Sequence, residues 1–214
     1  METDQRSSTA RPLHQLEDAG DVAGGARLPG RLAARPGPAT AAPALSSWQR
    51  TWQWVTAAAV TALLLTLSFA GHGWVPLLSG VDLVVHEAGH ALTAWAPPLL
   101  CSLAGSVAQV GVPLALAAYF AGRRDRFAVI VLIAWSAEST HNVAVYVADA
   151  QLMLLPLVGD DGSGAGHDWH NILTELDLLA STSLVAGAVR AASLALFAVA
   201  FALAARGWMR ARRG

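Results

Sequence analysis

The stretch Val81-Asp82-Leu83-Val84-Val85-His86-Glu87-Ala88-Gly89-His90-Ala91-Leu92 places ionisable residues at fixed spacing inside an apolar run. In a helix, residues four apart lie on one face, one turn from each other, so both imidazoles can reach the same metal ion. Glu87 lies between them, where it can act as a base without being a ligand. The alternative is a pair of core histidines that hydrogen-bond to neighbouring helices. Ionisable residues in apolar spans are costly and usually functional, which favours metal binding.

Composition predicts a membrane protein. Hydrophobic residues make up 54% of the 214 residues and charged residues 14%, and several apolar stretches reach the roughly 20 residues that a bilayer requires. We expect an all-α, polytopic membrane helical bundle of about five transmembrane segments, over residues 54–70, 76–95, 99–120, 127–147 and 183–205. Residues 1–47, rich in Ala, Gly, Pro, Arg and Ser, are predicted to form a disordered tail. Residues 48–214 are predicted to form one membrane-embedded domain.

The membrane orientation predicted from basic residues conflicts with five full spans. Arginine-rich flanks favour the cytoplasmic side of a membrane. Here the N-terminal tail, residues 123–126 and the C-terminus are all basic, and five full spans cannot place all three on one side. Either one segment is re-entrant, with residues 99–109 as the candidate, or one basic flank violates the rule.

Residue usage limits the possible metal ligands and partners. Cys101 is the only cysteine, which excludes an internal disulfide and a cysteine-based metal site. All fourteen basic residues are arginine, and together with the abundance of alanine this indicates a GC-rich genome. We therefore expect an integral membrane protein of a bacterial cell membrane. The net charge of −1 gives no indication of a nucleic-acid partner.

A catalytic zinc site needs three protein ligands and one open position for water. The two motif histidines supply two ligands, and the third should come from a later segment. Asp168 is our first choice and His167 the second, because this pair follows a glycine-rich stretch and precedes a helix. Alternatively, Asp168 caps the helix that begins near Asn171. Two further carboxylates are also candidates: Asp161 and Asp149.

Other polar residues in the apolar spans are candidates for supporting the metal or contacting substrate. Asp82 lies one turn before His86, where it could accept the free ring N–H and fix the tautomer; the alternative is an interfacial charge. A polar face on the fourth predicted span could serve the metal or the substrate, or join helices by hydrogen bonds. Its members, with the acidic residue at the end of the same helix, are Glu138, His141, Asn142 and Asp149.

With these residues, the chain resembles the site-2-protease family of intramembrane zinc metallopeptidases. The resemblance rests on His86-Glu87-Ala88-Gly89-His90-Ala91 in a predicted transmembrane helix. It implies that His86 and His90 bind zinc with an aspartate from a later helix, and that Glu87 is the acid–base residue. Gly105-Ser106-Val107-Ala108-Gln109 is similar to the family's Gly-x-x-x-Asn/Ser/Gly element but ends in Gln. Asp160-Asp161-Gly162 is the string nearest to the family's aspartate context.

The predicted function is hydrolysis of peptide bonds in membrane-embedded or membrane-tethered proteins. Zn²⁺ would activate a water molecule and Glu87 would take up its proton. The expected partners are a transmembrane protein substrate and the lipid bilayer. The alternative is a non-catalytic metal-binding or scaffold membrane protein derived from such a peptidase.

Overall fold

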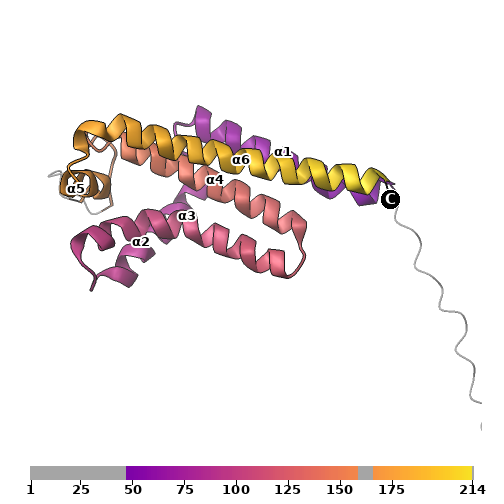
Figure 1. Cartoon of the computed structure of the whole chain (residues 1–214), viewed down its shortest axis with the longest axis horizontal. Coiled ribbons are helices and arrows are strands. Elements are labelled where there is room, and N and C mark those ends of the chain that lie inside the picture. Colours follow the sequence, from indigo (N-terminus) through magenta and orange to yellow (C-terminus); the bar gives the residue numbers. More distant parts are fainter. Residues whose placement is uncertain (1–46, 159–165, 214) are drawn as a thin grey trace, which may run out of the picture. The chain divides into compact units, whose positions relative to one another are not determined.

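A computed structural model of the chain describes residues 47–158 and 166–213, so all of the predicted tail except Ser47 lies outside the described residues. The described part is entirely helical, without strands, and belongs to one compact unit (Figure 1). This confirms the predicted all-α class. The α-helices are α1 (Ser47–Ala70), α2 (Leu78–Thr93), α3 (Pro98–Gly122), α4 (Arg126–Ala148), α5 (Asp168–Glu175) and α6 (Thr182–Arg213), with a 3₁₀ turn at Leu179–Ser181 before α6.

Four of the described helices are long and apolar enough to cross a membrane: α1, α3, α4 and α6. The segment predicted over residues 76–95 forms α2, which has only 16 residues. At 1.5 Å per residue it is about 24 Å long, shorter than the roughly 30 Å hydrocarbon core of a bilayer. The coarse prediction of a multispanning helical bundle therefore agrees with the structure, with four candidate spans in place of five.

The segment suggested as re-entrant, residues 99–109, is instead the first half of a continuous helix, α3. Pro98 occupies the first helical position, where its missing N–H costs no hydrogen bond, and the helix continues through Pro113. The helix too short to span a bilayer is α2, which packs against α3.

Local sequence also explains two other helix boundaries. Pro97 and Pro98 prevent α2 from continuing into α3, because proline lacks the N–H that the helix needs. At the start of α4, the Asp125 carboxylate accepts a hydrogen bond from the Ala128 N–H at 3.0 Å, which satisfies one unpaired donor of the first turn.

Helix α4 lies at the centre of the bundle. In the most apolar window of α4, 56% of the residues are buried, compared with 22% in the other three candidate spans. Small residues allow close helix contact: Ala57, Ala134 and Ala200 are fully buried between α1, α4 and α6. A side chain at Gly207 would collide with the Trp54 ring. This packing fixes the position of α4 between α1 and α6, and the C-terminal half of α4 forms one wall of the site.

Candidate functional site

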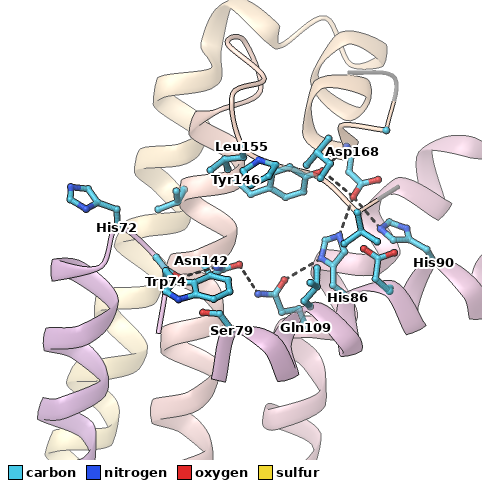
Figure 2. Close-up of a pocket in the computed structure, with 18 of the residues that line it drawn as sticks. His72, Trp74, Ser79, His86, His90, Gln109, Asn142, Tyr146, Leu155 and Asp168 are labelled. Carbon is cyan, nitrogen blue, oxygen red and sulfur yellow. Dashed lines mark hydrogen bonds and ion pairs between the residues drawn. The ribbon is translucent and has the colours of Figure 1, made fainter. Parts of the chain in front are cut away.

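Three potential metal ligands converge at one end of the bundle, from α2 and α5 (Figure 2). Asp168 Oδ2 lies 3.1 Å from His86 Nε2 and 3.1 Å from His90 Nε2. The two histidines are one helical turn apart on α2, as their spacing predicts, and Asp168 is the first residue of α5. Among the described residues, this is the only group of three or more His, Cys, Asp or Glu side chains close enough to hold one metal ion.

A chain of hydrogen bonds determines the tautomer of His86. The Gly73 carbonyl can only accept, so the Asn142 amide nitrogen points to it, at 2.8 Å. Asn142 Oδ1 then accepts from Gln109 Nε2 at 2.9 Å. Gln109 Oε1 therefore faces His86 Nδ1, at 3.1 Å, and accepts its proton (Figure 2). In the neutral ring, His86 Nε2 is left with a lone pair directed at Asp168.

A backbone carbonyl determines the tautomer of His90. Its Nδ1 lies 2.9 Å from the carbonyl oxygen of Cys101, the fourth residue of α3. Because a carbonyl has no proton to give, His90 Nδ1 carries the hydrogen, and the neutral ring presents an Nε2 lone pair to Asp168. Hydrogen bonds of this kind orient the imidazoles of protein metal sites.

Two imidazole lone pairs and a carboxylate oxygen therefore point at one another, and such a group needs a cation. Either a proton on a ring or a metal ion can fill this role. Ligands at about 2.05 Å from a tetrahedral zinc ion are about 3.3 Å apart. The two distances of 3.1 Å differ from that value by about the tolerance expected of a metal site. The donor set and these two distances fit Zn²⁺, and the three ligand atoms all lie within 4.8 Å of one another.

Two glycines allow α3 to approach the histidines closely. A Cβ atom at Gly105 would lie 2.5 Å from both Nε2 atoms, too close for either ring to keep its position. A Cβ atom at Gly89 would lie 2.5 Å from the Ala104 carbonyl oxygen, so α2 and α3 can touch only without a side chain there. Gly89 and Gly105 therefore permit the close contact between α2 and α3.

Hydrogen bonds and buried side chains at the start of α5 hold Asp168 in position. Its backbone N–H donates to the Tyr146 hydroxyl at 2.9 Å, and that hydroxyl lies 3.4 Å from Asp168 Oδ2. Trp169 Nε1 donates to Ser106 Oγ of α3 at 3.0 Å. Ile172 and Leu173 are buried beneath α5. Asp168 therefore comes to the site on a short but well anchored helix.

His167 is the N-cap of α5, which corrects the alternative that Asp168 fills this position. His167 Nδ1 accepts from the His170 N–H at 3.1 Å, and its Nε2 faces Asp149 at 3.3 Å. Burial lowers the pKa of His167 although Asp149 is beside it, which favours the neutral ring that a cap acceptor requires. Both ring nitrogens are thus occupied outside the three-ligand cluster.

The cluster borders a cavity of about 500 Å³, within the usual size range of ligand pockets. Glu87 lines this cavity together with both motif histidines. The remaining walls come from the loop after α1, from α4 and from the loop after it, and include Trp74, Tyr146 and Leu155 (Figure 2). The carboxylate of Glu87 is therefore available to a molecule beside the cluster.

Asp82 does not contact His86, contrary to the predicted tautomer-fixing role. Its Oδ1 accepts from Trp135 Nε1 at 2.8 Å and from Ser139 Oγ at 3.0 Å. Its carboxyl group also lies against that of Glu138. Both acidic residues are at most 1% exposed, and three of their oxygens have no donor among the described residues. Two neighbouring buried carboxyl groups do not favour a charge on both, and we infer that this pair shares a proton. The hydrogen bonds from Trp135 and Ser139 to Asp82 join α2 to α4.

The other predicted residues divide between the site and its support. Asn142 lines the cavity and belongs to the chain that orients His86. His141 instead stacks on Phe69 of α1, with ring centroids 3.8 Å apart. Asp149 accepts from the backbone N–H groups of Leu154 and Leu155 and so shapes the loop after α4. Asp161 lies outside the described residues.

Sequence reasoning missed Tyr146 and gave Gln109 no role. Tyr146 is four residues after Asn142, so it shares the polar face of α4, and this spacing was an available signal. Gln109 is four residues after Gly105, so both lie on the face of α3 that meets the histidines. Its partnership with His86 depends on how α2 and α3 pack and has no local signal.

Comparisons with protein-family models, with curated proteins and with solved structures gave no match to this chain.

Proposed function

We propose that this protein is a membrane-embedded zinc metallopeptidase similar to the site-2-protease family. The observation that carries the proposal is that His86 Nε2 and His90 Nε2 both lie 3.1 Å from Asp168 Oδ2. Hydrogen bonds to both Nδ1 atoms leave the Nε2 lone pairs free for a cation. A structural pair of core histidines would not require a carboxylate to meet both rings on the same side.

The chain's own residues have distinct roles in this proposal. His86, His90 and Asp168 hold Zn²⁺, which when bound supplies Lewis-acid activation of water and of the substrate carbonyl. Glu87, which lines the cavity, takes up the proton of the attacking water and returns it to the leaving amine. Tyr146 keeps Asp168 in place through its backbone N–H.

The substrate is a polypeptide in or beside a membrane. The cavity wall contains exposed apolar side chains, such as Trp74 and Val158, next to the acidic and imidazole groups. The polar groups are suited to the reacting peptide bond, and the apolar wall is suited to substrate side chains that come from lipid. A peptide bond becomes accessible to water only where the substrate helix is unwound.

The decisive experiment compares Glu87→Gln with the wild type in proteoliposomes that contain a test transmembrane substrate. We expect Glu87→Gln to retain about one zinc per chain, because Glu87 is not a ligand, and to lose cleavage. Glu175→Gln is the matched control, since Glu175 is an exposed residue at the end of α5, and it should cleave at the wild-type rate. Wild-type cleavage by Glu87→Gln would refute the peptidase. A wild-type protein that binds zinc without cleaving any test substrate would favour the non-catalytic alternative.

A further inference from the structure

The two ends of the candidate spans differ in charge: one end is rich in arginine, and the other has acidic residues and no arginine. One end carries the α3–α4 turn and the C-terminal part of α6, which contain seven arginines and a single acidic residue, Asp125. Side chains from this turn, from α6 and from Trp54 in the first part of α1 line one cavity of about 460 Å³. Its arginines are Arg124, Arg126, Arg206 and Arg210. These three flanks of the chain therefore lie at the same end of the helices.

The opposite end, where α2 and α5 lie, carries the candidate metal site (Figure 1). The described residues 71–77, 94–97, 149–158 and 166–181 contain four acidic residues and no arginine. Large apolar side chains are exposed outside the long helices here, including Trp74, Leu77, Trp95 and Leu154. Tryptophan in such positions is typical of a membrane–water interface.

Helix α2 does not add a crossing, which removes the orientation conflict of a five-span topology. Its first half packs at the middle of α4, where Asp82 contacts Trp135 and Ser139. Its second half lies beside the start of α3, where His90 contacts Cys101. The chain therefore crosses in α1, returns in α3, crosses again in α4 and returns in α6. With four crossings, the start of α1, the arginine-rich α3–α4 turn and the arginine-rich C-terminal part of α6 share one face.

We propose that the candidate metal site opens on the extracytoplasmic face of the membrane and cleaves polypeptide segments at that interface. The orientation follows from the four crossings and from the preference of arginine-rich flanks for the cytoplasm. The substrate class rests on the proposed function. It consists of membrane proteins whose cleaved segment is the outer end of a transmembrane helix or the chain just outside it.

The depth of the site supports an interfacial substrate. Asn142 and Tyr146 lie six and two residues before the last residue of α4, about 9 and 3 Å along the helix axis. In the hydrocarbon core an unwound backbone leaves polar groups without partners, whereas water can satisfy them at the interface. The extended segment that a peptidase must bind therefore costs least near this end of the bundle.

Cysteine labelling tests the orientation without any need for catalysis. In a Cys101→Ser background, Thr174→Cys places a thiol on exposed α5, and Gly122→Cys places one at the opposite end. Nothing lies within 4 Å of a Cβ at Gly122. A membrane-impermeant maleimide should label Thr174→Cys in intact cells and Gly122→Cys only after permeabilisation. The reversed pattern, or labelling of both cysteines from one face, would overturn the proposal.

A second experiment tests the substrate class. Purified protein is inserted in one orientation into liposomes with either of two transmembrane peptides, whose unwound segment lies at the face of Thr174 or at the face of Gly122. We expect cleavage of the first peptide only, and loss of this cleavage in Glu87→Gln. Preferential cleavage of the second peptide would refute the interfacial assignment. If neither peptide is cleaved while the labelling pattern holds, the peptidase function fails and the orientation stands.

Discussion

Replacing Gly105 with alanine adds a methyl group beside the Nε2 atoms of both candidate histidine ligands. The new carbon would lie 2.5 Å from His86 Nε2, 2.5 Å from His90 Nε2 and 2.6 Å from His86 Cδ2. Carbon and nitrogen atoms in contact are about 3.5 Å apart, so both rings must move by about 1 Å or α3 must retreat. Metal–ligand distances tolerate only about 0.2 Å. The shift also strains the bonds to Gln109 and to the Cys101 carbonyl, at 3.1 and 2.9 Å.

We therefore expect Gly105→Ala to lose at least 10- to 100-fold in zinc affinity, the usual effect of disturbing the groups that orient metal ligands. This loss corresponds to about 1.4–2.7 kcal/mol of binding free energy. The assay is competition with a chromophoric zinc chelator in detergent, with zinc content per chain measured by mass spectrometry. Far-ultraviolet circular dichroism would verify that the helices remain folded.

Gly111→Ala is the matched control because it makes the same change on the same helix. Nothing lies within 4 Å of a Cβ at Gly111, so zinc affinity should be unchanged. Alanine should also stabilise α3 by up to about 1 kcal/mol. If Gly105→Ala binds zinc as tightly as Gly111→Ala, the proposed position of the metal is wrong.

Three further outcomes are expected. Gln109→Leu keeps the side-chain size but removes the acceptor of the His86 Nδ1 proton, so zinc affinity measured by the same competition should fall about 10- to 100-fold; unchanged affinity would exclude this orienting role. Glu138→Gln should leave the melting temperature unchanged or raise it, because an amide N–H can donate to Asp82 in place of the shared proton. Glu138→Ala should lower the melting temperature. Equal decreases in melting temperature for the two variants would argue against the shared proton. Removing the metal with a chelator should lower the melting temperature, and adding free zinc at about 100 times its dissociation constant should restore about 2.7 kcal/mol of stability; a melting temperature that does not respond to zinc would contradict metal binding by the native fold.

Features that depend on short stretches of sequence were predictable. Apolar stretches predicted the helices, because each span must satisfy its own backbone hydrogen bonds. Pro97 and Pro98 marked the boundary between α2 and α3. The spacing of His86 and His90 predicted two imidazoles on one face, since helical periodicity fixes their relation.

Contacts between distant segments were harder to predict. Asp82 lies one turn before His86 on α2 and was the predicted partner of its ring, yet Gln109 from α3 meets that ring. The α2–α3 approach depends on close packing at Gly89 and Gly105, and one helix alone does not reveal it. Spacing along α2 pointed to Asp82, but the packing of α3 against α2 made Gln109 the hydrogen-bond partner of His86.

The sequence by itself determined that the chain forms apolar helices and that one of them carries a His-Glu-x-x-His face, because both properties arise within a few residues. Only the tertiary structure decided which later residue meets that face. Asp168 and His167 are adjacent in sequence, but the start of α5 turns Asp168 towards the histidines and His167 towards Asp149. Asp168 and His86 are 82 residues apart in the chain. Their contact depends on how α5 packs against α3 and α4, which no local pattern encodes.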